Sequence, residues 1–202
     1  MVTLETDRLI IRNYKPTDLP RYHQMMSDTE NMYYLSSFDI LTHSMEASEE
    51  SLAQAVAFND LGKGYRFCIA TKADNRLIGG IGYEIAANTP VGKVADPMGW
   101  FLMAGYHNRG YITEAVKRLL GFAFLQDNCV RVATACFKDN VPTQKVMAKV
   151  GFRKEAEKRQ AMWLDGAMRD RLEFAINRDE WEAQVHMNEK ERVTKHMTID
   201  SR

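Results

Sequence analysis

The sequence lacks the features that mark several large classes of protein. No apolar run approaches the roughly 20 residues of a membrane-spanning helix, so we expect no membrane partner. The N-terminus shows no succession of basic, apolar and small residues, so no signal peptide is predicted and a cytoplasmic location is expected. Because 27 basic residues balance 27 acidic ones, the composition gives no reason to expect nucleic acid as a partner.

Cysteine and histidine are also sparse. The three cysteines, Cys68, Cys129 and Cys136, are an odd number at unrelated spacings, and two of them lie in or beside apolar runs. This pattern predicts buried, reduced thiols, because a free cysteine usually packs as a small hydrophobic residue. The five histidines are scattered, and neither CxxC nor HExxH occurs, so no metal site is expected.

Several common catalytic and nucleotide-binding motifs are missing as well. The chain has no GxxxxGK[ST] phosphate loop and no G-x-S-x-G elbow, which excludes the commonest hydrolase signature. The run Gly79-Gly80-Ile81-Gly82 resembles part of a dinucleotide loop. Compared with the motif G-x-G-x-x-G, it lacks the last glycine and the helix that should follow. It continues into a strand pattern instead, so we interpret it as strand.

The remaining patterns predict a single α+β domain over residues 1–184, followed by a polar tail over 185–202. The chain is 202 residues long with 45% hydrophobic residues, and it contains no internal repeat. Asp165-Gly166 between two apolar runs is a strong hairpin signal. Apolar periodicity predicts helices over 18–27, 45–60, 113–126 and 142–150, and strands ending near 12 and over 65–71, 77–85, 98–103, 131–137, 152–164 and 167–176. An aromatic loop over 31–44 and a polar loop over 88–96 are expected between them.

The most informative stretch is strand, tight loop and helix over residues 98–124. Gly105 and Gly110 allow tight turns and close approach of a ligand to the backbone, and Thr113 followed by Glu114 suits a helix start. The free N–H groups of a first helical turn, together with the positive end of the helix dipole, suit a phosphate or pyrophosphate. The sequence therefore predicts an anion-binding loop before this helix.

Taken together, the motifs resemble the Gcn5-related N-acetyltransferase (GNAT) superfamily, and within it the branch of ribosomal-protein N-terminal acetyltransferases. The matching stretches are 4–12, 99–102, 109–115, 140–143 and 151–152, together with Asp165-Gly166 and Asp170. The resemblance implies a mixed α/β domain whose mostly antiparallel sheet is splayed into a V, with helices on both faces. It also implies that acetyl-CoA, as co-substrate, lies in the opening of the V.

The family's pyrophosphate loop falls on residues 107–112, with His107 and Ile112 departing from the usual residue types. The pantetheine arm would pair with the strand ending near Met103 as an extra strand. Arg109 would contact a phosphate or be a solvated loop residue, and Asn140 would hold the cofactor or cap the next helix. The cofactor-binding residues implied are Leu102, Met103, Asn108, Arg109, Gly110, Tyr111, Ile112, Thr113, Asn140 and Thr143.

The chemistry of acetyl transfer requires three further roles. A backbone N–H near Leu102 or Met103 is the candidate donor to the oxyanion. Thr143 is the candidate donor to the leaving thiolate, although a threonine in a first helical turn also serves local backbone bonding. Glu84 is the candidate base, or else it lies on a solvated face. Glu155 and Glu157 would face the acceptor instead, and Glu114 is expected to complement the helix N-terminus.

The acceptor side is expected to contain Tyr33, Tyr34, Phe38 and Trp163, each of which would otherwise belong to the core. The leading hypothesis is transfer of acetyl to a primary amine, either a protein N-terminus or a small molecule, by direct attack in a ternary complex. The alternative is a non-catalytic acyl-CoA sensor or assembly module, and a xenobiotic amine is a further candidate acceptor. A homodimer is common in the family, but no sequence feature demands it.

Overall fold

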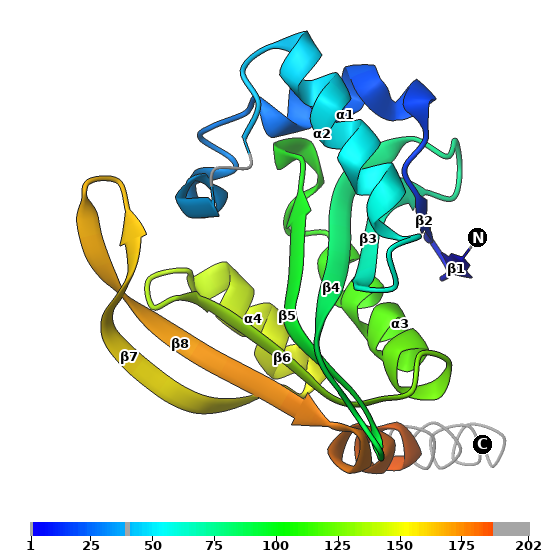
Figure 1. The fold of residues 1–202 in the computed structure, drawn as a ribbon, viewed down its shortest axis with the longest axis vertical. Helices are drawn as coiled ribbons and strands as arrows, with labels where there is room; N and C mark the ends of the chain where they lie inside the picture. The colour runs from blue at the N-terminus through cyan, green and yellow to red at the C-terminus, as the bar shows by residue number, and fades with distance from the viewer. Residues whose placement is uncertain (1, 39–40, 188–202) are drawn as a thin grey trace, which may run out of the picture.

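The computed structural model describes residues 2–38 and 41–187, which form a single eight-stranded sheet flanked by helices (Figure 1). The strand order is β1-β2-β3-β4-β5-β6-β8-β7, and every neighbouring pair is antiparallel except β5 and β6. The strands are β1 (Thr3–Glu5), β2 (Leu9–Asn13), β3 (Gly64–Thr71), β4 (Leu77–Thr89), β5 (Gly92–Leu102), β6 (Cys129–Phe137), β7 (Arg153–Leu164) and β8 (Ala167–Asn177). The helices are α1 (Leu19–Met26), α2 (Met45–Phe58), α3 (Tyr111–Leu125) and α4 (Val141–Val150), with short 3-10 turns at Pro16–Asp18, Tyr33–Phe38 (η2) and Ala104–Tyr106.

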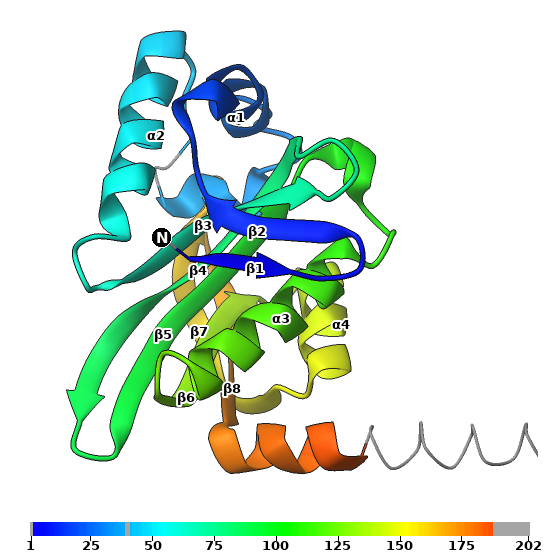
Figure 2. The same cartoon turned by 90° about the vertical axis from the view of Figure 1, so that its right-hand side faces the viewer.

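Helices cover both faces of the sheet because its central strands alternate apolar residues between two cores. In β3, Phe67 and Ile69 pack into the core that contains α3, whereas Cys68 and Ala70 pack into the core that contains α1 and α2. Figure 2 shows α1 and α2 gathered at one end and α3 with α4 against the other face. The mixed α/β class with a mostly antiparallel sheet is thus confirmed.

The sheet divides at its one parallel junction. Strands β5 and β6 pair only from Lys93↔Cys129 to Ala95↔Val132, and beyond that point they diverge (Figure 1). The side chain of Thr134 spans the start of the gap, where its Oγ1 donates a hydrogen bond of 2.6 Å to the Met98 carbonyl. The predicted V therefore opens where the backbone pairing of β5 and β6 ends and the Thr134 side chain bonds to β5 instead.

The prediction for residues 88–96 was wrong. The polar stretch 88–96, expected as a loop, belongs to a long hairpin arm in which β4 continues to Thr89 and β5 begins at Gly92. Pairs such as Ile85↔Ala95 and Asn88↔Lys93 hold this arm. Much of the arm is solvent-exposed, so polar residues interrupt its few apolar ones and leave no clear hydrophobic alternation to indicate a strand.

The C-terminal hairpin agrees closely with its turn signal. Asp165 and Gly166 both adopt positive φ, 50° and 74°, as the turn that joins β7 to β8 requires. After β8 the chain forms a helical segment over 178–187. Most of the predicted tail, residues 188–202, lies outside the described residues, and the boundary at 184 stays a prediction. None of the described helices is long and apolar enough to cross a membrane.

Candidate functional site

The tight loop that the sequence predicts as an anion-binding loop lies at the start of α3. Gly110 is the N-cap in the left-handed conformation, φ 79°, and Asn108 also has a positive φ of 58°. Within the described chain, the backbone N–H groups of Tyr111, Ile112 and Thr113 have no protein acceptor. These donors and the helix dipole point out of the same end of α3, so the loop can hold a phosphate through main-chain groups.

Beside this loop, the last residues of β5 present an open backbone edge. The Met103 N–H donates to the Ile78 carbonyl over 2.9 Å, so it is used within the β4–β5 ladder. Because backbone groups alternate in direction along an antiparallel strand, those of Leu102, Trp100 and Met98 face away from β4, into the V. Of the two predicted oxyanion donors, the Leu102 N–H is therefore the one that faces the opening.

The Leu102 carbonyl on the same edge already has partners. It accepts a hydrogen bond of 2.8 Å from Asn31 Nδ2, and His107 Nε2 lies 3.1 Å away. A carbonyl oxygen can only accept, so His107 carries a hydrogen on Nε2. Although His107 departs from the family pattern, this contact gives it a structural role, because it ties the anion-binding loop to the end of β5.

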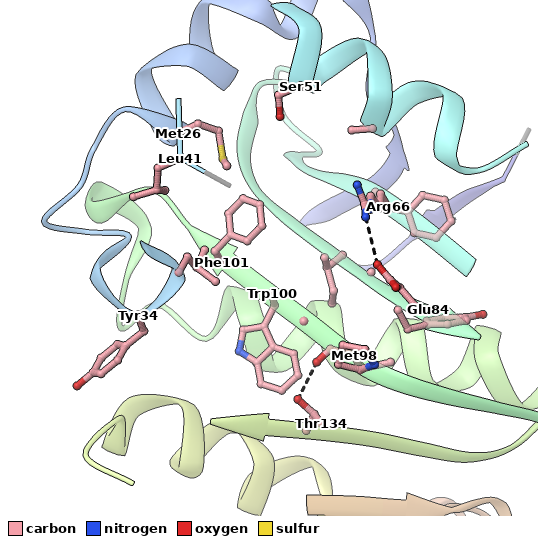
Figure 3. A pocket seen from close by; sticks show the side chains of 18 of the residues that line it. Met26, Tyr34, Leu41, Ser51, Arg66, Glu84, Met98, Trp100, Phe101 and Thr134 are labelled. Atoms are coloured by element: carbon pink, nitrogen blue, oxygen red, sulfur yellow. Dashed lines mark hydrogen bonds and ion pairs between the residues drawn. The ribbon is translucent and has the colours of Figure 1, made fainter. Parts of the chain in front are cut away.

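A cavity of about 630 Å³ lies where the V meets the face covered by α1 and α2 (Figure 3). Figure 3 shows Trp100 and Thr134 between β5 and β6, with Glu84 and Arg66 at the opposite side of the cavity. The cavity brings together four of the predicted residues that lie far apart in the sequence, namely Tyr34, Glu84, Asn140 and Thr143.

Asn140 and Thr143 lie at the start of α4, on the β6 side of the V. The Asn140 side chain accepts from the Thr143 N–H over 3.2 Å and so caps the helix. The Thr143 hydroxyl has no hydrogen-bond partner among the described residues, so the local backbone bonding considered from the sequence is absent. This hydroxyl is thus free to donate to a ligand in the cavity.

Glu84 is half exposed and forms an ion pair of 3.1 Å with Arg66, whose guanidinium stacks on the Phe58 ring at 4.1 Å. Glu84 lines the cavity and is also open to solvent, so its role as the base stays a prediction. Glu155 and Glu157 are used elsewhere, in ion pairs with Arg131 and Lys138.

The predicted acceptor residues are only partly assembled. The Tyr34 ring lies 5.7 Å from that of Phe137 and lines the cavity, whereas Tyr33 packs edge-on against Tyr34 and is not part of the lining. Trp163 is exposed on β7 and does not line the cavity either. Phe38 ends η2, and its side chain lies outside the described part of the structure.

The cavity also contains residues that sequence reasoning missed. Gly82 and Gly99 are cross-strand partners and form the floor of the cavity. The floor is open above Gly99, where an added Cβ would meet nothing within 4 Å in the described chain, whereas a Cβ on Gly82 would clash with the Tyr65 backbone. Tyr14, 5% exposed, lines the cavity without a hydrogen-bond partner for its hydroxyl in the described chain. Burial raises the pKa of Tyr14 well above its usual range, so the hydroxyl stays a donor.

Helix α2 forms one wall of the cavity, and the sequence predicts the helix but not this role. Its lining residues recur at helical spacing; they include Ala47, Glu50, Ser51 and Gln54. Cys136, which the sequence analysis describes only as a thiol expected to be buried, lines the cavity too, since β6 carries it there. Burial, with a smaller effect of Asp139, raises the pKa of the Cys136 thiol to about 11. Among the described residues, no group of three metal-ligating side chains occurs.

Comparison with known proteins agrees with this geometry. The family described as "Acetyltransferase (GNAT) domain" matches residues 8–153. The N-acetyltransferase YnaD of Bacillus subtilis (strain 168) is 26% identical over 178 residues, which cover 88% of this chain and 98% of that protein.

Two solved structures share the fold. The ribosomal-protein-S5-alanine acetyltransferase from Vibrio fischeri has a TM-score of 0.75 and 22% identity, with 90% of this chain and 99% of that one covered. RimL, a ribosomal L7/L12 alpha-N-protein acetyltransferase solved in complex with coenzyme A, has a TM-score of 0.75 and 20% identity, covering 89% and 99%.

Proposed function

Because this chain belongs to the GNAT acetyltransferase family, and is therefore an N-acetyltransferase, we propose that it transfers acetyl from acetyl-CoA to a primary amine by direct attack in a ternary complex. One observation carries the proposal. The N–H groups at the start of α3 have no acceptor in the described chain, and they follow a loop that His107 ties to the end of β5. The open edge of β5 in turn lines, at Met98 and Trp100, the cavity that contains Glu84 and Thr143. Acetyl-CoA bound along the N–H groups of α3 and the edge of β5 would place its thioester at the cavity.

Backbone groups of the chain supply most of the contacts that we expect to hold acetyl-CoA. The N–H groups of Tyr111, Ile112 and Thr113 suit the pyrophosphate, and the outward-facing groups of Trp100 and Leu102 suit the amides of the pantetheine arm. Because these contacts are made by main-chain atoms, the unusual side chain of Ile112 is compatible with them.

In the reaction, a neutral amine nitrogen forms a bond to the thioester carbonyl carbon, and the carbon–sulfur bond then breaks. The Leu102 N–H is placed to donate to the developing oxyanion. Glu84 makes the amine neutral by taking, directly or through water, the proton that the bound ammonium loses before attack, and the second nitrogen proton leaves with the thiolate as the thiol. The Thr143 hydroxyl donates to the leaving thiolate, so all charge that develops during transfer meets a group of this chain.

The lining of the cavity favours an acceptor with an apolar group beside its amine. Aromatic and sulfur-containing side chains dominate the wall around the Gly82 and Gly99 floor; they include Tyr22, Phe101, Met26, Met98 and Met162. The ribosomal-protein acetyltransferases among the fold neighbours support a peptide N-terminus as this amine, and a small amine is the second candidate.

A route through an acetyl-cysteine is disfavoured by the state of the cysteine in the cavity lining. With its pKa raised to about 11, the Cys136 thiol is almost entirely protonated at neutral pH and is a poor nucleophile. Direct attack then needs both substrates bound together.

The test is thiol release from acetyl-CoA in the presence of a panel of small amines, xenobiotic amines and ribosomal-protein N-terminal peptides. We expect release with at least one class, with intersecting rather than parallel lines in initial-rate plots that vary both substrates. Parallel lines, together with loss of activity in Cys136→Ser, would favour a covalent route. Calorimetric binding of acetyl-CoA without release for any acceptor would favour a non-catalytic acyl-CoA sensor.

A further inference from the structure

The turn between β1 and β2 reaches the anion-binding loop through a single side chain, Arg8. Its Nε donates to Glu114 Oε2 over 2.7 Å, and its NH1 donates to the Arg109 carbonyl over 3.0 Å. The guanidinium also stacks on the Tyr111 ring, with 4.5 Å between its central carbon and the ring centroid. One side chain, 101 residues before Arg109 in the sequence, thus contacts the residues on both sides of Gly110.

The contact with the Arg109 carbonyl sets the direction of a neighbouring donor. In a trans peptide unit the C=O and N–H point in opposite directions. Since the Arg109 oxygen points toward Arg8, the Gly110 N–H points away from it, and no acceptor in the described chain takes it. The N–H of Gly110 is therefore added to the donors at the start of α3.

This peptide unit is an easy one to flip, because glycine tolerates φ values on both sides of zero. A flip would turn the Arg109 carbonyl oxygen toward the anion site and withdraw the Gly110 N–H from it. In the described part of the chain little else restrains the unit, since Arg109 and Gly110 are exposed and a Cβ on Gly110 would meet only Arg8 there within 4 Å.

Arg8 is itself held in place by Glu114. The Glu114 carboxylate accepts from the Arg8 backbone N–H over 3.1 Å and from the Thr6 hydroxyl, as well as from the guanidinium. Burial alone would raise the Glu114 pKa, but the hydrogen bonds from Thr6 and Arg8 lower it on balance. Glu114 is thus an ionised anchor whose oxygens are already engaged, and it has no donor to offer a phosphate.

We propose that Arg8 is a positioning residue that fixes the Arg109–Gly110 peptide with its N–H facing the pyrophosphate of acetyl-CoA. The proposal rests on the proposed function, because it assumes that this loop binds the pyrophosphate. It assigns a role in cofactor affinity to a residue of the β1–β2 turn, which approaches the loop from outside the V.

The test compares Arg8→Met with a matched control, Arg118→Met. Arg118 lies on α3 and its Nε donates to the Glu5 carbonyl over 3.1 Å, so it also joins the helix to the first hairpin, but away from the loop. For each variant we would measure the Kd of CoA by calorimetry, and kcat and KM with two donors, acetyl-CoA and S-acetyl-pantetheine, which lacks the pyrophosphate.

For Arg8→Met we expect the Kd of CoA and the KM for acetyl-CoA to rise about tenfold, as for loss of one to two hydrogen bonds, with kcat within about threefold of the wild type. The kcat/KM with S-acetyl-pantetheine should not change, and Arg118→Met should match the wild type with both donors. Arg8→Lys keeps the charge and can donate to one carbonyl, so its Kd of CoA and its KM for acetyl-CoA should lie between those of the wild type and those of Arg8→Met.

Equal losses with both donors, or equal effects of Arg8→Met and Arg118→Met, would overturn the proposal, since either result indicates general destabilisation. An unchanged Kd in a folded Arg8→Met would overturn it as well. If Arg8→Met does not fold, Arg8→Lys carries the same test, and a wild-type Kd and KM in that variant would overturn the proposal. A wild-type protein that binds no CoA would instead refute the proposed function.

Discussion

The side-chain oxygen of Asn140 lies 3.2 Å from the backbone nitrogen of Thr143 and accepts its hydrogen bond. This contact starts α4 at the wall of the cavity. Among the described residues, it leaves two groups without a hydrogen-bond partner, the Asn140 amide nitrogen and the Thr143 hydroxyl. A capping interaction therefore also orients the residue that we place beside the leaving thiolate. The two roles of Asn140 and the role of Thr143 can be separated by substitution.

Replacing Thr143 with valine removes the hydroxyl and keeps the shape of the side chain. If the hydroxyl donates to the thiolate, kcat should fall about 100-fold, a typical effect of losing proton donation in the transition state, while the Kd of CoA stays near that of the wild type. Steady-state kinetics and calorimetry check this. Thr143→Ser, which retains the hydroxyl, is the control, and equal rates for the serine and valine variants would refute the role.

Replacing Asn140 with serine separates capping from cofactor binding. Serine caps helices about as well as asparagine, so the free energy of unfolding should change by no more than about 0.5 kcal/mol. The amide nitrogen is lost, so the KM for acetyl-CoA should rise about tenfold if that group contacts the cofactor. Urea denaturation and initial rates provide the two readouts.

The comparison for Asn140 is its alanine variant, which loses both the oxygen that caps α4 and the amide nitrogen. Asn140→Ala should cost about 1 kcal/mol of stability through the missing cap. If the serine variant keeps the wild-type KM and only alanine is impaired in stability, then Asn140 is a cap and nothing more.

How far the sequence predicts this molecule depends on how local each feature is. The Asp165-Gly166 turn and the loop before α3 were predicted correctly, because both depend on backbone conformations that glycine and its neighbours encode within a few residues. The V-shaped sheet followed only from the resemblance to a family. No local pattern indicates that β5 and β6 separate after Ala95.

The features that were missed depend on residues far apart in the chain. Arg8 and Glu114 are 106 residues apart, and nothing near either one indicates the other as its partner. Gly99 was noticed only as part of a motif, because the sequence does not state what lies opposite a glycine in a sheet. Trp163 was expected in the site because it is large and aromatic, yet it lies exposed on β7.

Gly99 offers a direct way to fill the acceptor side of the cavity. A Cβ there meets nothing within 4 Å, and its backbone conformation is one that valine adopts readily in a strand, so Gly99→Val should fold normally. The added methyl groups occupy space over the floor, so the KM of the acceptor should rise about tenfold or more, with the Kd of CoA unchanged. Kinetics with the best acceptor of the panel and calorimetry with CoA measure the two effects.

A graded series strengthens this test. Gly99→Ala adds one methyl group and should have a smaller effect than valine, and acceptors with smaller apolar groups should be less affected by either variant. If both variants keep the wild-type KM for every acceptor, the amine does not enter over Gly82 and Gly99.

Glu84 and Glu50 both line the cavity, which allows a matched test of the base. Glu84→Gln keeps the size of the side chain and removes its ability to take a proton. If Glu84 deprotonates the amine, kcat should fall about 100-fold, whereas Glu50→Gln should stay within about threefold of the wild type. The loss should shrink as pH rises, because the fraction of neutral amine grows toward the amine pKa, about 8 for an α-amine, and less base assistance is needed. Rate profiles from about pH 6 to about pH 9 for the three proteins measure this, and a constant ratio of wild-type to Glu84→Gln rates across that range would contradict the assignment.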